Sequence, residues 1–436
     1  MAAVHYSGNT NPTAVANFQL RVKHVGLLEP MISNERHYMH ELAANLASFP
    51  ARLGKIQFRR ITTSNRFIPA IDGFRFLAII IVIISHVYVQ CAPVPTESPF
   101  SSAFYQIFKD GKRGVYLFFT ISGFILALPF ARHHLQQGRT VSLKSYFKRR
   151  ITRLEPPYII VMLVRFLILI VYKSKLFSFG VLLKHFLASI FYAHGLVYGQ
   201  YPVVNPVAWS LEVEIQFYIL APVLTCVFAI RSKFWRRSLL LIFIAVSGLF
   251  AGHVISPLLR PSLTLLNFLQ FFLAGFVLVD LYLTEDIPTL TPLLWDAIGL
   301  TALAWIMLSQ SPNYLIILPF VTLTLFLGGF KGKFVRGFFS SALISAIGGM
   351  CYSLYLTHSA ILSLMTPYVQ RIARLPLFNT LQLILIIIPC VIAVLISGSI
   401  FYLLIERPCM AADWPNRLAQ KFCAGIRTRH NAVSES

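Results

Sequence analysis

The segment FRFLAIIIVIISHVYV, residues 74–89, is almost entirely apolar, yet Arg75 lies at its start and His86 near its end. An apolar run of this kind predicts a helix that crosses a membrane. At about 100° and 1.5 Å per residue, the two polar side chains share one helix face and lie about 16 Å apart along its axis. An arginine in hydrocarbon costs on the order of 3 kcal/mol, so we expect Arg75 to face protein, water or an anionic ligand. The simpler alternatives are that Arg75 extends to the membrane interface and that His86 is a packed structural side chain.

The composition of the whole chain also indicates a membrane protein. Of its 436 residues, 56% are hydrophobic and only 12% are charged, whereas about 25% are charged in an average soluble domain. The net charge of +22 comes from Lys and Arg residues that lie mostly between apolar runs, as the positive-inside rule predicts for cytoplasmic loops. We therefore expect contact with membrane lipids and no nucleic-acid partner. The six cysteines have no metal-binding spacing and are expected to be small core side chains.

Long apolar runs recur along the chain and predict an all-α polytopic membrane protein, with about ten transmembrane helices in one bundle and no large soluble domain. With ten spans, the basic clusters between the runs fall on the same side as residues 1–66, which are predicted to be a cytoplasmic tail. An eleventh crossing at 180–200 would disturb this agreement, so that segment is expected to be interfacial or re-entrant. Residues 67–408 would form the transmembrane domain, and 409–436 a second cytoplasmic tail. The expected spans lie near 69–90, 113–131, 155–173, 205–230, 238–256, 262–283, 292–309, 313–330, 342–365 and 378–404.

A second polar feature lies in NPVAWSLEVEIQFYILAP, residues 205–222. Ser210, Glu214 and Tyr218 are spaced by four residues and share one helix face, whereas Glu212 is about 200° away from Glu214. A buried carboxylate between hydroxyl groups would suit the orientation of a histidine or of a sugar hydroxyl. A structural hydrogen-bond anchor between helices explains the same pattern.

Two further segments carry polar residues near or inside an expected span. In MCYSLYLTHSAIL, residues 350–362, Tyr355 and His358 are neighbours on one helix face, which would also suit a packing seam. In FKRRITRLEPPY, Arg150 and Arg153 lie one turn apart and could hold phosphate groups, although the positive-inside rule alone explains them. Motifs of metal sites, Walker loops and dinucleotide-binding loops are absent from the sequence, which predicts no metal.

Seven segments of the sequence stand in a characteristic order, and in this order they resemble the motifs of the membrane acyltransferase-3 family. Members of that family O-acylate polysaccharides, lipopolysaccharide and other glycans, and sometimes lipids or small molecules. The resemblance covers residues 68–408, and its specificity comes from the order, because each motif is short. The segments are IDGFRFLAIIIVIISH (71–86), GVYLFFTISGFILA (114–127), RRITRLEPPY (149–158), WSLEVEIQFYILAP (209–222), FFLAGFVL (271–278), YSLYLTHSAIL (352–362) and IERP (405–408).

The resemblance implies roles for residues that the polar pattern also selects. Its Arg, ten residues, His pattern falls on Arg75 and His86, and its cytoplasmic Arg-x-x-Arg pattern falls on Arg150 and Arg153. Its WSLxVExQFY pattern selects Glu214, in agreement with the helix-face argument.

The late SYSLYLxH-type pattern of the family falls on Ser353, Tyr355 and His358. This chain has Thr357 where many members carry a tryptophan, which would leave a roomier site. We expect four hydroxyl-bearing residues to contact the substrate, namely Ser210, Tyr218, Ser353 and Tyr355.

The resemblance implies an enzyme that transfers an acyl group from acyl-CoA to a hydroxyl of a cell-surface glycan, a glycolipid or a small hydroxylated acceptor. The acyl group that we expect is acetyl. Acyl-CoA would be a co-substrate, with no permanently bound cofactor. The predicted catalytic residues are His86, Glu214 and His358, and the predicted donor-binding residues are Arg75, Arg150 and Arg153.

Two routes remain open for His86. It could act as general base, oriented by Glu214, or it could carry the acyl group itself. The alternative function is a transporter or flippase of a lipid-linked sugar, whose path the intramembrane Arg, Glu and His would line. In either case we expect a multi-pass protein of the cell membrane with both termini in the cytoplasm.

Overall fold

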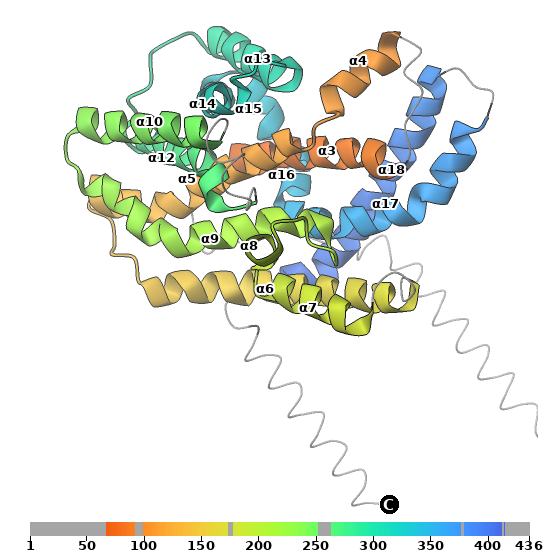
Figure 1. Ribbon diagram of the computed structural model, residues 1–436. Coiled ribbons are helices and arrows are strands. Elements are labelled where there is room, and N and C mark those ends of the chain that lie inside the picture. Colours follow the sequence, from red (N-terminus) through yellow and green to blue (C-terminus); the bar gives the residue numbers. More distant parts are fainter. Residues whose placement is uncertain are drawn as a thin grey trace, which may run out of the picture. The chain divides into compact units, whose positions relative to one another are not determined.

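The computed structural model describes residues 67–91, 99–172, 178–251, 263–375, 379–411 and 414. Both predicted tails therefore lie wholly or almost wholly outside the described residues. Within the described ranges, every regular element is a helix (Figure 1), as expected of an all-α protein. The helices are α3 Pro69–Cys91, α4 Pro99–Phe108, α5 Lys112–Gln136, α6 Leu143–Tyr172, α7 Phe179–Ile190, α8 His194–Tyr198, η2 Pro206–Ala208, α9 Trp209–Leu224, η3 Thr225–Ala229, α10 Lys233–Leu249, η5 Leu265–Asn267, α12 Leu269–Thr284, α13 Pro292–Leu308, α14 Tyr314–Lys331, α15 Phe334–Phe339, α16 Ala342–Gly349, α17 Cys351–Ala373, α18 Asn379–Phe401, η6 Tyr402–Glu406 and α19 Arg407–Cys409.

Six of these helical stretches are long and apolar enough to cross a membrane. The expected count of about ten is not confirmed. The described parts of α10, α12 and α13 have 16 or 17 residues, which is just short of the roughly 18 that a bilayer crossing needs. The six candidate spans are Pro69–Tyr88, Ser102–Gln136, Leu143–Val171, Pro206–Ala229, Tyr314–Lys331 and Thr380–Cys409.

The expected span 342–365 is two helices and not one. Helix α16 ends at Gly349 and α17 begins at Cys351, with Met350 between them. A Cβ atom at Gly348 would lie 1.6 Å from the carbonyl oxygen of Asp72, so only glycine allows α16 to meet the first turn of α3 at this distance. The break places α17 along α3, which brings its polar residues to those of the opening segment.

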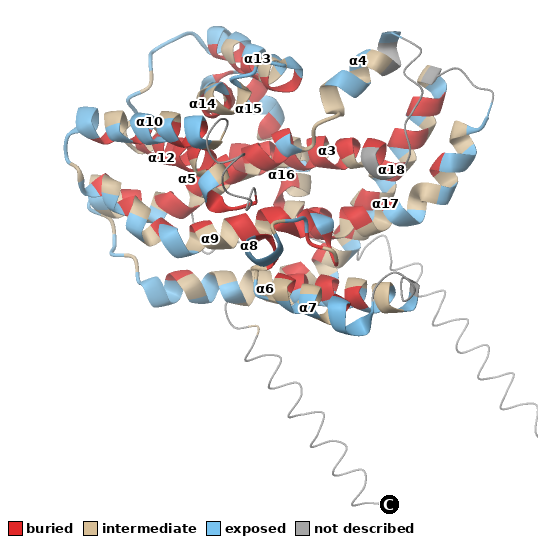
Figure 2. Ribbon diagram, viewed as in Figure 1, coloured by how far each residue is buried: buried red, intermediate tan, exposed pale blue. Residues whose placement is uncertain are grey.

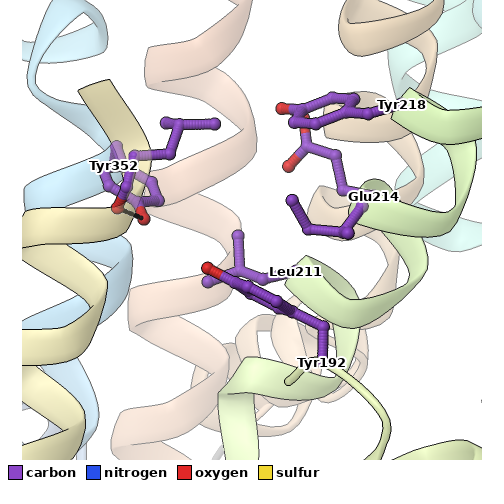
Figure 3. A pocket seen from close by; sticks show the side chains of 7 residues that line it. Tyr192, Leu211, Glu214, Tyr218 and Tyr352 are labelled. Atoms are coloured by element: carbon purple, nitrogen blue, oxygen red, sulfur yellow. Dashed lines mark hydrogen bonds between the residues drawn. The ribbon is translucent and has the colours of Figure 1, made fainter. Parts of the chain in front are cut away.

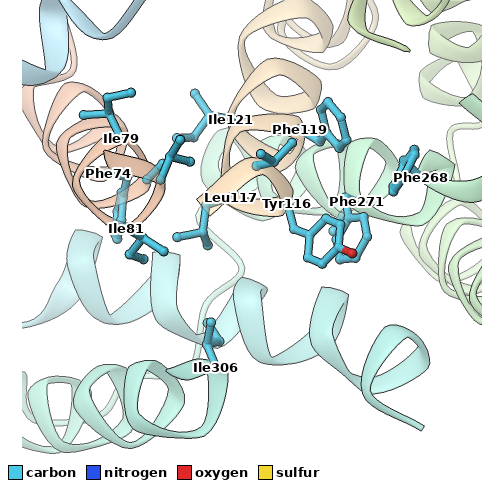
Figure 4. Packing of buried hydrophobic residues seen from close by; sticks show 14 of the residues in the cluster. Phe74, Ile79, Ile81, Tyr116, Leu117, Phe119, Ile121, Phe268, Phe271 and Ile306 are labelled. Carbon is cyan, nitrogen blue, oxygen red and sulfur yellow. The ribbon is translucent and has the colours of Figure 1, made fainter. Parts of the chain in front are cut away.

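The core lies between α3, α5 and α12, where the burial is most continuous (Figure 2). Aromatic side chains fill it, for example Phe74 of α3, Phe119 of α5 and Phe271 of α12, each at most 2% exposed (Figure 4). Helices α5 and α12 touch through their backbones, because a Cβ atom at Gly123 would lie 2.1 Å from the carbonyl oxygen of Phe272. Small residues at such a seam let helices pack closely without hydrophobic help from water.

Helix α6 lies at the edge of the bundle and exposes an apolar band that includes Ile159, Leu163, Val164 and Leu167. Membrane hydrocarbon would cover such a band. Together with the six candidate spans, this surface identifies a membrane protein.

The segment at 180–200 turns back along α6, and its predicted interfacial or re-entrant position in the membrane stays a prediction. Helix α7 runs beside α6 (Figure 1), and the Tyr158 hydroxyl donates to the carbonyl of Ser189 over 2.8 Å. The Tyr192 hydroxyl reaches Glu155 at 3.2 Å, and Arg165 then donates to the carbonyl of Val204 over 2.8 Å. After α7 the chain therefore lies beside Glu155 of α6 at Tyr192. It lies beside Arg165, further along α6, at Val204, shortly before α9 begins.

Candidate functional site

Two histidines from distant parts of the sequence meet in the core. The rings of His86 on α3 and His358 on α17 have centroids 4.9 Å apart and an interplanar angle of 78°. The Nδ1 atom of His86 lies 2.8 Å from the carbonyl oxygen of Val82, and that of His358 lies 2.7 Å from the carbonyl of Tyr355. A carbonyl oxygen only accepts, so each Nδ1 carries the proton and each neutral ring keeps a basic lone pair on Nε2.

The Nε2 atom of His358 is buried, and no hydrogen-bond partner for it occurs within the described residues. Buried polar atoms are normally paired, and leaving one unpaired costs about 1–3 kcal/mol. An accepting nitrogen kept in this state is suited to a hydroxyl-bearing ligand or to a proton.

Tyr355 and Ser210 link α17 to α9 beside this pair. The Tyr355 hydroxyl donates to the carbonyl of Val207 over 2.9 Å, and it lies 2.6 Å from the hydroxyl oxygen of Ser210. Because Tyr355 has one proton to give, Ser210 donates to Tyr355 in this arrangement. The Tyr355 ring also lies against His358, with centroids 5.5 Å apart. We call His86, His358, Tyr355 and Ser210 the histidine cluster.

Glu214 is one turn further along α9, about 6 Å from Ser210 along the axis. Its carboxylate accepts a hydrogen bond from the Tyr218 hydroxyl over 2.6 Å and another from the Ser122 hydroxyl of α5. Glu214 therefore shares a face with Ser210 and Tyr218, as the spacing predicts. Glu214 thus bonds hydroxyl groups, while His86 bonds the backbone of its own helix. The predicted orienting role of Glu214 stays a prediction.

Arg150 approaches Glu214 through two tyrosines. Its guanidinium stacks on the Tyr146 ring, with the central carbon 3.6 Å from the centroid, and lies 5.5 Å from the centroid of Tyr218. The Tyr146 hydroxyl donates to the carbonyl of Tyr218 over 3.1 Å. Glu214 lies within electrostatic reach of Arg150, so this cation has a carboxylate nearby without a direct ion pair.

Arg153 points to a different carboxylate. It lies 3.6 Å from Glu406, whose side chain is fully buried. Glu406 also accepts from the backbone N–H of Ser353 at 3.1 Å and from its hydroxyl at 2.5 Å. The guanidinium groups of Arg150 and Arg153, predicted to act together on phosphates, thus lie beside two separate carboxylates in this structure.

Arg75 forms an ion pair with Asp72 one turn earlier on α3. Its side chain is 13% exposed, and Glu214 is within its electrostatic reach. The structure therefore places Arg75 with the carboxylates rather than with His86. We call Arg75, Arg150, Arg153, Glu214 and Glu406 the arginine cluster.

The two clusters are neighbours, because they share helices. On α9, Ser210 of the histidine cluster and Glu214 of the arginine cluster are about 6 Å apart along the axis. On α17, His358 is about 7.5 Å along the axis from Ser353, which bonds Glu406 of the arginine cluster. A cavity of about 10 Å³ lies at Glu214, with room for about one water molecule. Figure 3 shows Glu214 and Tyr218 on one side of it and Tyr352 on the other, with Tyr192 of the segment 180–200 also in its wall.

Several residues of this region carried no role at the level of the sequence. Ser122 and Glu406 lie inside the quoted motifs. Asp72 and Tyr146 lie within one helical turn of Arg75 and Arg150 in the sequence. Only the fold shows what these four residues contact. Arg165 is different: it interrupts the apolar run of α6 as Arg75 interrupts that of α3, so the same signal could have found it. It lies within electrostatic reach of His358.

The segment at 180–200 holds a second histidine pair. His185 Nδ1 lies 2.9 Å from His194 Nε2, and His194 Nδ1 lies 3.2 Å from the carbonyl of Gln200. Burial lowers the pKa of both histidines, and the charge of His185 lowers the pKa of His194 further. Glu212, which the helix-face argument separates from Glu214, accepts from the N–H of Gly195 over 2.7 Å and anchors this segment to α9.

Comparisons with known proteins give one consistent result. The profile of a family described as an acyltransferase domain matches residues 68–402. "Putative O-acetyltransferase SACOL0978" of Staphylococcus aureus (strain COL) is 27% identical over 336 residues, which cover 70% of this chain and 52% of that protein. "O-acetyltransferase OatA" of Staphylococcus aureus (strain NCTC 8325) is 25% identical over 335 residues with the same coverage. The chain spans about half the length of these relatives, and no solved structure matches it significantly.

Proposed function

The chain belongs to the acyltransferase-3 family, and from this premise we propose that it transfers an acetyl group from acetyl-CoA to a hydroxyl group of a cell-surface polysaccharide, a glycolipid or a smaller hydroxylated acceptor. The relatives named as O-acetyltransferases support the acetyl group and the oxygen acceptor. The observation that carries the proposal is the pair of contacting imidazoles, His358 buried and His86 partly buried, each with its lone pair on Nε2.

In the proposed reaction, His86 is the general base. Its Nε2 takes the proton of the acceptor hydroxyl while the oxygen attacks the thioester carbon of the donor. The carbon–sulfur bond then breaks, and the departing thiolate of CoA takes the proton from the imidazolium. The Val82 carbonyl holds Nδ1–H, which fixes the tautomer that this step requires. In the alternative route His86 attacks the thioester first and passes the acetyl group on.

His358 and the arginine cluster complete the proposal. His358 packs its ring against His86 and supplies a second accepting nitrogen, while Ser210 and Tyr355 hold α9 and α17 together beside it. Arg150, Arg153 and Arg75 are the groups that would attract the phosphates of the donor. Because the cavity at Glu214 holds about one water molecule, donor binding would require its walls to separate.

The membrane orientation follows from the charges. We infer a multi-pass protein of the cell membrane whose basic loops, and both termini, face the cytoplasm, where acetyl-CoA is available. The arginine cluster would then receive the donor from that side, and the histidine cluster, further along α3 and α17, would meet an acceptor that reaches the other half of the membrane.

The test uses the purified protein in nanodiscs with acetyl-CoA and a panel of hydroxylated acceptors, and measures the release of free CoA thiol. We expect acceptor-dependent release by the wild type and its loss in His86→Ala. Equal release by both proteins would refute the role of His86. Movement of a glycolipid across vesicles without any thiol release would instead establish the transporter.

A further inference from the structure

A cavity of about 400 Å³ lies where α5, α12 and α14 end and α15 begins. This volume falls within the range of small-ligand sites, about 300–1,000 Å³. Three cations line it, Arg132 from α5, Lys331 from α14 and Arg336 from α15, together with one carboxylate, that of Glu285. The cavity therefore has an excess of positive charge.

Two of the three cations of this cavity have no ion pair within the described part of the chain. Lys331 and Arg336 are exposed, and no ion pair of either occurs within the described ranges of the chain. A single basic residue at the end of a helix complements the helix dipole. That effect does not explain three cations from three helices around one hollow, where like charges repel unless an anion lies between them.

The position of the cavity separates it from the histidine cluster. A Cβ atom on Gly111 would lie 3.7 Å from the His86 ring, and Arg132 is 21 positions further along the same chain segment. At 1.5 Å per residue this is about 31 Å along α5. A ligand in the cavity does not reach the histidine cluster.

The walls of the cavity suit a ligand at the membrane surface. Arg132 lies about one turn before Gln136, the last residue of one candidate span, and Lys331 is the last residue of another. Tyr282 and Phe330 add aromatic surface beside the cations, with ring centroids 5.7 Å apart, and aromatic side chains are typical of the level of lipid head groups. Basic pockets between helices at this level bind phosphate-bearing lipid head groups.

We propose that this cavity is a binding site for the head group of an anionic phospholipid, with Arg132, Lys331 and Arg336 around the phosphate. The site is separate from the histidine cluster, where the proposed acetyl transfer takes place. Phosphates of a soluble nucleotide offer the same chemistry, so the experiment must separate the two sources.

The experiment is native mass spectrometry of the full-length protein released from detergent, with phosphatidylglycerol or phosphatidylcholine added. The test variant is Arg132→Gln/Lys331→Gln/Arg336→Gln. The matched control, Lys144→Gln/Lys148→Gln/Lys333→Gln, removes the same charge from exposed residues that do not line the cavity. The single variant Lys331→Gln, at an exposed side chain, keeps the test valid if the triple variant fails to fold.

We expect the wild type and the control variant to retain phosphatidylglycerol in preference to phosphatidylcholine. Each cation contributes about fivefold in affinity at a membrane surface, so we expect about hundredfold weaker binding in the triple variant and about fivefold in Lys331→Gln. Equal loss in the control variant, or unchanged binding in the test variant, would overturn the proposal. Saturable binding of adenosine 3′,5′-bisphosphate that only the cavity variant loses, with lipid binding unaltered, would overturn it in favour of a nucleotide site.

Discussion

Replacement of His86 by glutamine separates its chemical role from its structural one. Among the described residues, this side chain makes a hydrogen bond of 2.8 Å to the Val82 carbonyl and an edge-on ring contact with His358. A hydrogen bond contributes about 0.5–1.5 kcal/mol and a ring pair a similar amount. We therefore expect His86→Gln to lower the free energy of unfolding by about 0.5–1.5 kcal/mol, because glutamine can donate to the same carbonyl but loses the ring contact.

The expected effect on the rate is larger than the effect on stability. Glutamine cannot take a proton from the acceptor hydroxyl, and general-base catalysis contributes about 10²–10⁴-fold, or roughly 3–5 kcal/mol of activation free energy. Thiol release should therefore fall by that factor at saturating acetyl-CoA, and the pH dependence of the residual rate should lose the limb that the base causes in the wild type.

The control for this experiment is the folded fraction. Thermal unfolding and size-exclusion chromatography in the same nanodiscs measure it, and the rate is expressed per folded molecule. A rate within about threefold of the wild type would refute the reasoning, because no base could then reside at His86. A large loss of rate that follows the loss of folded protein would show that His86 is structural.

Three further results follow from particular contacts. Gly123→Ala should lower the free energy of unfolding by at least about 1–3 kcal/mol, because its Cβ would lie 2.1 Å from a backbone oxygen. Gly337→Ala is the control, since its Cβ would have nothing within 4 Å, and it should be neutral or slightly stabilising; thermal unfolding of both variants is the measurement. Burial lowers the pKa of His185 and His194, so the unfolded chain binds protons at these residues more readily than the folded chain. The free energy of unfolding should therefore fall as the pH drops below about 6.5. The fall in melting temperature between pH 7.5 and 5 should be smaller in His194→Gln. Tyr355→Phe removes the hydroxyl that bonds the Val207 carbonyl over 2.9 Å and should lower the free energy of unfolding by about 1–3 kcal/mol; an unchanged unfolding curve would contradict the link between α9 and α17.

The sequence predicts the class of the fold because the hydropathy of single helices is a local property. The apolar runs of α3, α5, α6 and α14 are long and nearly free of charge, and each forms a candidate span. The region at 342–365 is equally apolar but divides at Met350, because Gly348 must approach the backbone of α3. That requirement belongs to the tertiary packing, and no periodicity within the segment expresses it.

The candidate site is predictable only in part for the same reason. The helix-face rule correctly puts Ser210, Glu214 and Tyr218 on one side of α9, since it depends on one helix alone. The meeting of His86 with His358 depends on how α3 packs against α17, and no spacing rule reaches across 272 positions. Family resemblance selected both residues, but it did not state that their rings touch.

The arginines show why intramembrane charges need the tertiary structure for their interpretation. Arg75 lies with Asp72, Arg153 with Glu406, and Arg150 within reach of Glu214. An unpaired cation at such depth is costly, so each carboxylate keeps its arginine tolerable while no anionic donor is bound. A phosphate group would then exchange one anion for another rather than neutralise a free charge. On this reasoning, the carboxylates make the arginines selective for ligands that bind by two or more strong hydrogen bonds, since a weaker anion could not displace them.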